Sequence, residues 1–235
     1  MEAVTTAQPL AVDQIHTNAI LLESGPVTIR YLSDTEEDRE FAAKVTIEAF
    51  ERKVVHATSR GSIPDIQVYY ANSLRGRQPT FYERHFIAEY DGQKAGSCVI
   101  RYHGDRELFP LRDEDMPPVG CTDMCGLFCM GLAANFEIYI AGKCCVDHIG
   151  VNSEFRGKGI GKVLLDMAEI DAKRKGCKAI YLYVATTNRA QHLYERQGYI
   201  IKERRTICCC GYWCMTGERE FARMEKILEG DKENC

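Results

Sequence analysis

The spacing of apolar residues along the first half of the chain predicts alternating strands and helices. The run 27–32 is rich in β-branched residues, which favours a strand, and residues 33–36 form a Ser-x-x-Glu capping pattern. That pattern predicts a helix extending to Phe50. Pro64 is typical of the first turn of a helix and predicts a second one over residues 65–74.

A hairpin and an additional segment are predicted next. Two alternating runs, 81–90 and 95–102, flank an Asp-Gly turn at residues 91–92, an arrangement typical of antiparallel strands. Residues 104–135 then begin as an acidic loop with prolines and end in the apolar run 124–134. That run is too short to span a bilayer. It predicts a helix that either covers the sheet or lies on a lipid surface, and the absence of a basic polar face favours the first.

The second half continues the alternation of strands and helices. A β-prone run ends at Val151, and apolar residues recur at helical spacing from Ile160 to Ala172. The remaining runs predict strands over 179–184, 199–205 and 218–228 and a short helix over 188–196. Residues 1–26 and the charged residues 229–235 lack periodicity, and we interpret them as a mobile N-terminal tail and a C-terminal tail.

Length and charge narrow the class of protein. With 235 residues and 45% hydrophobic content, the chain can bury a full core, and one domain is the simplest expectation. Lys and Arg total 30 against 34 Asp and Glu, a net charge of −4 that gives no basic footprint for a nucleic acid partner. No run reaches the roughly 20 apolar residues that span a bilayer, and no secretory signal pattern opens the chain. We therefore expect a soluble cytoplasmic protein.

The 12 cysteines do not form a metal-site pattern. No Cys-x-x-Cys pair occurs, so we expect no structural metal. Free cysteine is among the most buried residue types, which favours small, reduced core residues. Cys121, Cys125 and Cys129 would line one helix face, and four more cysteines lie in 208–214. Peripheral membrane contact through these two segments remains an alternative.

The stretch 146–165 carries the clearest sign of chemistry. Three glycines in 157–161 stand between a predicted strand and a predicted helix. Glycines there let the backbone approach a ligand, and the first amides of a helix can bind a phosphate. The stretch is not a P-loop, because Gly161-Lys162 is followed by Val163 instead of Ser or Thr. It also has the wrong glycine spacing and position for a dinucleotide-binding fingerprint.

Residues 156–161 read Arg-Gly-Lys-Gly-Ile-Gly, which resembles the Arg/Gln-x-x-Gly-x-Gly/Ala motif of the GNAT superfamily of N-acetyltransferases. Residues 188–199, with their Asn, Ala, Leu-Tyr-Glu and a Gly before an aromatic, resemble the family's second signature. The run 221–226 looks like its last strand, which commonly carries Met-x-Lys. The resemblance covers about residues 27–228.

The resemblance implies one α/β domain over 27–228, with 104–135 as an insertion. Its sheet would be mixed, mostly antiparallel, splayed between strands four and five and flanked by helices. In the family, the motif cradles the pyrophosphate of acetyl-coenzyme A (acetyl-CoA) and the preceding strand pairs with the pantetheine arm. The implied co-substrate is acetyl-CoA, with no metal. The implied cofactor-binding residues are Ile149, Gly150, Val151, Arg156, Gly157, Lys158, Gly159, Ile160, Gly161, Lys162 and Asn188.

Two residues are implied in catalysis. Strand alternation predicts that Asp147 shares a face with Cys145 and Ile149, whereas His148 faces the other way. In the family, the first face points to the acceptor, so Asp147 would take the amine proton directly or through water; a structural ion pair is its alternative. Tyr194 lies where relatives place the tyrosine that protonates the leaving thiolate, and ordinary packing is its alternative.

The expected activity is transfer of an acetyl group to a primary amine, either a small amine or an amino acid derivative, by direct attack in a ternary complex. A protein lysine or N-terminal acetyltransferase is an alternative within the same chemistry. A non-catalytic acyl-CoA sensor would need residues 156–161 but neither Asp147 nor Tyr194. Because both residues are present, catalysis is favoured.

Overall fold

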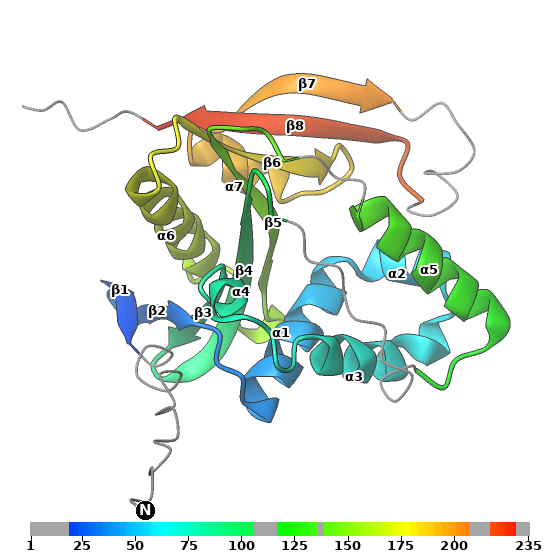
Figure 1. The fold of residues 1–235 in the computed structure, drawn as a ribbon. Helices are drawn as coiled ribbons and strands as arrows, with labels where there is room; N and C mark the ends of the chain where they lie inside the picture. Colours follow the sequence, from blue (N-terminus) through cyan, green and yellow to red (C-terminus); the bar gives the residue numbers. More distant parts are fainter. Residues whose placement is uncertain (1–18, 106–116, 136–138, 207–216, 229–235) are drawn as a thin grey trace, which may run out of the picture.

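A mixed sheet forms the centre of the computed structural model, which describes residues 19–105, 117–135, 139–206 and 217–228 (Figure 1). Its strands are β1 (Ile20–Ser24), β2 (Val27–Tyr31), β3 (His85–Tyr90), β4 (Gln93–Tyr102), β5 (Lys143–Val151), β6 (Ala179–Ala185), β7 (Ile200–Thr206) and β8 (Glu220–Ile227). Their order is β1-β2-β3-β4-β5-β6-β8-β7. Neighbours are antiparallel except for the parallel pair β5–β6.

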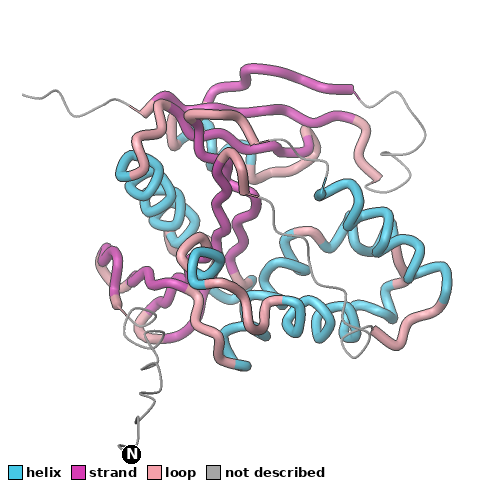
Figure 2. Tube along the Cα trace, viewed as in Figure 1, coloured by secondary structure: helices cyan, strands magenta, loops and turns pink. Residues whose placement is uncertain are grey.

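Helices cover both faces of this sheet (Figure 2). They are α1 (Glu36–Ala49), α2 (Glu51–Ala57), α3 (Ile63–Ser73), α4 (Pro79–Tyr82), α5 (Cys121–Asn135), α6 (Ile160–Arg174) and α7 (Gln191–Arg196), with the 3₁₀ turns η2 (Arg60–Ser62) and η4 (Ser153–Phe155). The larger core lies between the sheet and α6 and includes Leu164, Ile180 and Met224, all fully buried. On the opposite face α1 packs so closely that a Cβ on Gly150 would lie 2.6 Å from the side chain of Val45.

The sheet is splayed where its two parallel strands separate. β5 pairs with β6 from Lys143 and Ala179 up to Val146 and Leu182, although β5 continues to Val151. Beyond Val146 the two strands diverge. The predicted splay is therefore confirmed, and it falls between β5 and β6 because β1 adds a strand before the expected first one.

The predicted elements are largely confirmed, including the hairpin of β3 and β4. The first strand of that hairpin is shorter than the predicted run 81–90, because residues 79–82 form α4 and β3 begins at His85. The turn residues Asp91 and Gly92 have φ values of +49° and +75°, as a type I′ turn requires. Residues 20–24 form β1 and pair with β2, so the prediction of a mobile tail over 1–26 is wrong for them. The Gly25-Pro26 dipeptide is the turn of a hairpin, with Gly25 at φ +59°. Because β1 is mostly exposed, its sequence lacks a clear alternation of apolar residues. The predicted tails at residues 1–18 and 229–235 lie outside the described part of the chain.

The insertion 104–135 contains the predicted helix, α5, but that helix contacts α2 instead of covering the sheet. A Cβ on Gly126 would overlap the carbonyl oxygen of Ala57, so the glycine permits the close approach. Asp123 fixes the contact by accepting hydrogen bonds from the backbone amide and hydroxyl of Ser59, at 3.0 and 2.7 Å. The helix therefore extends the α1 side of the molecule.

The cysteines of the described residues differ in burial, and Cys177 is intermediate. Cys98, Cys144 and Cys145 are buried, as predicted for small core residues. Cys121 and Cys125 on α5 are exposed, so the core interpretation is wrong for them. They face solvent because α5 meets α2 through Gly126 instead. The segment 208–214 lies outside the described residues.

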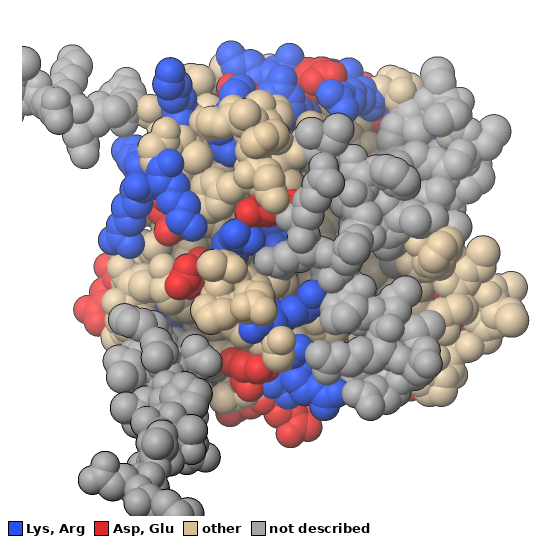
Figure 3. Space-filling view, in the orientation of Figure 1, with Lys and Arg blue, Asp and Glu red and all other residues tan. Residues whose placement is uncertain are grey.

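The visible surface carries charges of both signs. Figure 3 shows Lys and Arg side chains along the edge formed by β7 and β8, with acidic side chains between them. Arg205 and Arg223 both contact the carboxylate of Glu203, at 2.7 and 3.4 Å. This edge therefore does not form a continuous basic stripe.

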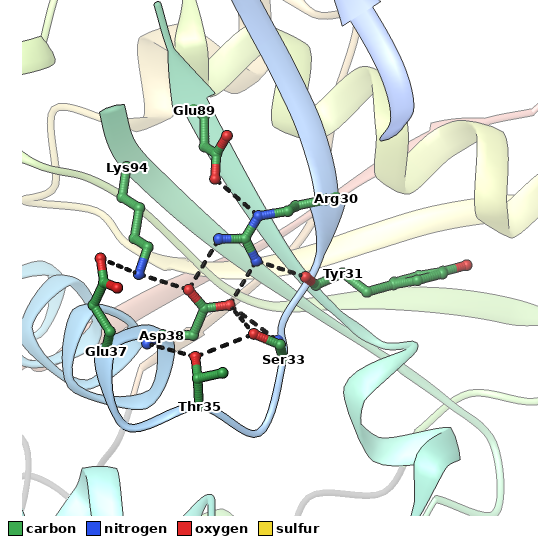
Figure 4. Close-up of polar contacts among 8 residues, drawn as sticks. All are labelled: Arg30, Tyr31, Ser33, Thr35, Glu37, Asp38, Glu89 and Lys94. Atoms are coloured by element: carbon green, nitrogen blue, oxygen red, sulfur yellow. Dashed lines mark hydrogen bonds and ion pairs between the residues drawn. The ribbon is translucent and has the colours of Figure 1, made fainter. Parts of the chain in front are cut away.

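A buried ion-pair network fixes the start of α1 (Figure 4). The helix begins after Thr35, not after Ser33 as predicted, because the Thr35 hydroxyl accepts a hydrogen bond from the Asp38 amide. Arg30 on β2 donates two hydrogen bonds to the Asp38 carboxylate, at 2.5 and 2.9 Å, and Lys94 on β4 lies 2.7 Å from it. Burial alone would raise the pKa of Asp38, but the hydrogen bonds from Arg30, Lys94 and Ser33 hold that pKa well below its usual range.

We expect Asp38→Asn to lower the free energy of unfolding by about 3 kcal/mol at pH 7, because Arg30 and Lys94, both mostly buried, lose the carboxylate that they share, although Arg30 keeps its ion pair with Glu89. A depressed folded-state pKa stabilises the fold above the unfolded-state value of about 3.9, and this contribution disappears as the pH falls through the folded-state pKa. The difference in free energy of unfolding between the wild type and the variant should therefore shrink as the pH falls below 4. Urea unfolding across this range measures the effect. Glu37→Gln, at an exposed carboxylate on the same Lys94, is the control and should change little.

Candidate active site

A β-bulge interrupts β5 at Asp147. In the register with β4, His148 is opposite Val99 and Val146 is opposite Ile100, so Asp147 has no partner residue on β4. A bulge inserts one extra residue and breaks the two-residue alternation of side chains. Side chains on the two sides of Asp147 therefore do not follow the simple pattern that the sequence suggested.

The bulge places Asp147 and His148 on the same face of the sheet. The Oδ2 atom of Asp147 lies 3.6 Å from Nδ1 of His148, and Nε2 of His148 lies 3.2 Å from the hydroxyl of Thr46 on α1. Ile149 packs instead into the core beneath α6. The prediction that Asp147 shares a face with Ile149, and that His148 points away from Asp147, is wrong for this reason.

Asp147 is a partly exposed carboxylate among basic groups. Its side chain is 26% exposed, and its Oδ2 lies 3.7 Å from Nε of the buried Arg101. Burial by itself would raise the pKa of Asp147, but the contacts with His148 and the charges of Arg101 and His85 outweigh it and hold that pKa below its ordinary value. Asp147 is therefore ionised at neutral pH. The ion pair with Arg101 exists, and it leaves part of the carboxylate open to solvent.

The backbone of the glycine loop is arranged around positive φ angles. Gly157 and Gly159 have φ values of +80° and +81°, and Gly159 caps the start of α6. A Cβ at either position would meet nothing within 4 Å, so the backbone conformation, not a lack of space, requires glycine. The hydrogen-bond ladder of α6 begins with the amide of Lys162 bonded to the carbonyl of Gly159. The amides of Ile160 and Gly161 precede that bond, where a helix favours an anion.

Side chains in the loop are held mostly by internal contacts. Nε of Arg156 donates to the carbonyl of Val151 at 3.3 Å. The ammonium of Lys158 lies 4.5 Å from the ring centre of Tyr90 and 4.9 Å from that of Phe155, within cation–π distance. Backbone amides, more than these two side chains, therefore line the open side of the loop.

Three other predicted residues also have structural partners. Lys162 forms an exposed ion pair with Asp166 at 2.6 Å. Asn188 accepts a hydrogen bond from the Ala190 amide at 2.9 Å through its side-chain oxygen, and so shapes the turn before α7. A Cβ on Gly161 would lie 3.0 Å from the side chain of Leu193, so this glycine lets α6 and α7 approach closely.

Tyr194 on α7 is buried in the core beneath α6. Its ring lies 6.2 Å from that of Tyr199. Burial raises the pKa of Tyr194 well above its usual value, and neighbouring Cys98 acts in the same direction. Cys98 is opposite Ile149 in the β4–β5 register, beyond the last pair of β5 with β6. Tyr194 is therefore a protonated hydroxyl close to the part of β5 that the splay leaves without a β6 partner.

Sequence reasoning missed three members of this site: Thr46, His85 and Arg101. They come from α1, β3 and β4 and meet His148 and Asp147 only in the folded chain. Thr46 and His85 line one small buried pocket with Ser97 and His148. No motif connects them, and the one available signal was the presence of polar residues on predicted apolar faces.

The described residues contain neither a metal-binding cluster nor a membrane-spanning helix. Within those residues, no group of three or more His, Cys, Asp or Glu side chains is close enough to hold a metal ion. Among the same residues, no helix combines the length and the apolar content needed to cross a bilayer.

Comparison with known proteins identifies the family of this chain. The model of the acetyltransferase (GNAT) family matches residues 56–199. The chain belongs to the GNAT family. Mycothiol acetyltransferase of Propionibacterium freudenreichii subsp. shermanii is 43% identical over 54 residues, which cover 23% of this chain. The match spans only 17% of that relative's length.

Solved structures agree on the GNAT fold. A structure described as an acetyltransferase has a TM-score of 0.53 and 22% identity, covering 86% of this chain and 99% of its own. PaiA N-acetyltransferase from Thermoplasma acidophilum, in complex with coenzyme A, has a TM-score of 0.51 and 20% identity, covering 86% of this chain and 98% of its own. At these identities the likeness establishes the fold of this GNAT protein.

Proposed function

We propose that this GNAT protein transfers an acetyl group from acetyl-CoA to a primary amine by direct attack in a ternary complex. The observation that carries the proposal is the arrangement of one strand, β5. Its bulge directs Asp147 and His148 to the α1 face, its far end has no β6 partner, and it leads into the Gly159-capped helix. An extended ligand could pair with residues 149–151 while its phosphates meet the start of α6.

Residues of this site can account for both proton transfers in the proposed reaction. The Asp147–His148 pair takes a proton from the attacking amine, whose nitrogen forms a bond to the thioester carbon. The carbon–sulfur bond then breaks, and Tyr194 gives its proton to the departing thiolate. Burial raises the pKa of Tyr194, which keeps the hydroxyl protonated at neutral pH but makes it a weaker acid, so its position near the unpaired part of β5 is what supports this role.

Direct attack is favoured over an acyl-enzyme intermediate. Cys98, next to Tyr194, is the thiol at this position, and burial raises its pKa well above the usual value. The thiolate is the nucleophilic form of cysteine, so a buried thiol of this kind is a poor acceptor of the acetyl group. The amine is therefore proposed to attack acetyl-CoA itself.

The test is an assay in which purified protein is incubated with acetyl-CoA and a panel of amines. Turnover is measured as release of the free coenzyme A thiol. The panel contains small primary amines, amino acid derivatives and lysine-bearing peptides. Acetylation of at least one class well above the rate without protein supports the proposal. Tight acetyl-CoA binding without transfer to any class would instead indicate an acyl-CoA sensor.

Cofactor binding gives a separate prediction at Gly159. Acetyl-CoA should raise the melting temperature of the wild type, because it binds the folded state. Gly159→Val should abolish that shift, since a side chain and a changed φ angle would close the loop to phosphate. The intrinsic strain should cost about 1–2 kcal/mol. Differential scanning fluorimetry with and without acetyl-CoA measures both effects.

Gly104→Val is the matched control. Gly104 has φ +89° and equally open surroundings, but it follows β4, away from the start of α6. It should show similar strain and a normal ligand shift. A full ligand shift in Gly159→Val would remove the glycine loop from the cofactor site.

A further inference from the structure

The ammonium group of Lys53 lies over the splay of the sheet. This half-buried residue of α2 places its Nζ atom 4.8 Å from the ring centre of Phe50 and 5.1 Å from that of Phe221. The Phe50 ring lies edge-on against the ring of His148 on β5, 6.1 Å away between centres. Phe221 is opposite Ala185, the last residue of β6. Lys53 therefore bridges the two strands where they diverge, on the face to which the proposed base points.

Contacts of α2 with the far side of the splay hold this lysine in place. The guanidinium of Arg52 donates a hydrogen bond to the Thr187 hydroxyl at 3.2 Å and lies 3.4 Å from the carboxylate of buried Glu218. Thr187 follows β6, and Glu218 precedes β8. A Cβ on Gly217 would lie 2.8 Å from the ring of His56, so α2 packs directly against the chain that enters β8. The position of the lysine is therefore set by tertiary contacts.

The side chain of Lys53 has the chemistry of the proposed acceptor class. Its Nζ atom is a primary amine on a flexible four-carbon stem. A cation–π contact is a weak attraction, so the amine can leave the two rings and turn toward β5 without unfolding α2. The ring of Phe50 contacts both the ammonium and His148. The amine and the proposed base therefore lie on either side of one aromatic ring.

We propose that Lys53 is an acetyl acceptor and that the protein acetylates this residue of its own chain. The Asp147–His148 pair takes the proton that the lysine nitrogen loses, the nitrogen forms a bond to the thioester carbon, and the carbon–sulfur bond breaks. Tyr194 gives its proton to the departing thiolate and regains one from solvent. Overall, the lysine ammonium and the thioester yield an amide, a free thiol and one proton, which passes to water. This inference rests on the proposed acetyl transfer, with Lys53 in the place of the free amine.

A second lysine separates a specific site from general reactivity. Lys44 on α1 has a side chain that is 53% exposed, and its ammonium lies 4.0 Å from Glu48 of the same helix. If exposure alone decided acetylation, Lys44 would react faster than half-buried Lys53. A site at the splay makes Lys53 the faster of the two. The variant Lys53→Arg keeps a positive charge between the rings and removes the amine that can be acetylated.

The experiment incubates the full chain with saturating deuterium-labelled acetyl-CoA and no added amine, and peptide mass spectrometry follows the label at each lysine. Lys53 should gain the label at least about tenfold faster than Lys44, at a rate that does not change when the protein is diluted. Lys53→Arg should lose this label, and Lys44→Arg should keep it. In urea the two lysines should react alike, because the unfolded chain has no site.

The same preparation is assayed with the panel of free amines. Acetylation of a free amine together with equal labelling of Lys53 and Lys44 would overturn self-acetylation and leave the proposed function intact. A labelling rate that rises with protein concentration would also overturn it, because a second copy would then be the acceptor. If Lys53→Arg fails to fold, the map of labelled lysines in the wild type decides alone. Transfer to neither a free amine nor Lys53 would contradict the proposed function and self-acetylation together.

Discussion

Tyr194→Phe should lower turnover about 10²-fold or more while leaving the affinity for acetyl-CoA nearly unchanged. The variant keeps the ring that packs beneath α6 and removes the hydroxyl proposed to protonate the thiolate. Burial keeps this hydroxyl protonated over the whole neutral range. Steady-state turnover and a thermal shift with acetyl-CoA separate the chemical step from binding.

Tyr199→Phe is a matched control for this change. Tyr199 lies in the same core, 6.2 Å from Tyr194 between ring centres, and its buried hydroxyl interacts with Glu169 on α6. Removing this hydroxyl should leave turnover unchanged and should lower the free energy of unfolding by about 1 kcal/mol or less. Normal turnover in a folded Tyr194→Phe variant would assign Tyr194 to packing alone.

Local patterns were enough to predict most elements and the conformation of the glycine loop. The positive φ angles of Gly157 and Gly159 follow from glycine at a strand-to-helix junction, and the turn at 91–92 follows from Asp-Gly. The amides at the start of α6 are a property of any helix N-terminus. These features depend on a few neighbouring residues, so the sequence alone specifies them.

The arrangement around Asp147 could not be predicted in the same way. A bulge is a property of two paired strands. The sequence of residues 146–151 alone does not determine their register with β4. One extra residue reversed the predicted side of His148, and with it the choice of partner for Asp147. The position of Thr46 depends on α1, which the network of Arg30, Asp38 and Lys94 holds at its first turn. Such contacts are tertiary, and alternation along a single strand does not encode them.

The structure therefore changes what Asp147 is expected to do. A carboxylate whose pKa lies below its ordinary value is a weak base when it acts alone. With the imidazole of His148 3.6 Å away, the same carboxylate can favour a positive charge that forms on the ring. The ionised state of Asp147 is thus compatible with proton removal from an amine only because His148 lies beside it.

Asp147→Asn keeps the shape of the side chain and removes the charge, and we expect turnover to fall about 10²-fold or more. The acid limb of the pH–rate profile should move to lower pH, because the pair has lost the negative charge that favours proton uptake. The contact with Arg101 is 3.7 Å long and the carboxylate is partly exposed, so the loss of stability should be only about 1 kcal/mol.

Turnover across pH and urea unfolding on the same samples measure both quantities. Asp34→Asn, at a partly exposed carboxylate 2.6 Å from Arg39, is the control and should match the wild type in turnover. If the ion pair with Arg101 is the only role of Asp147, the Asp147→Asn protein should lose stability and activity together. A stable variant with normal turnover and an unchanged profile would exclude both roles, and the amine would then lose its proton to water before it reaches the site.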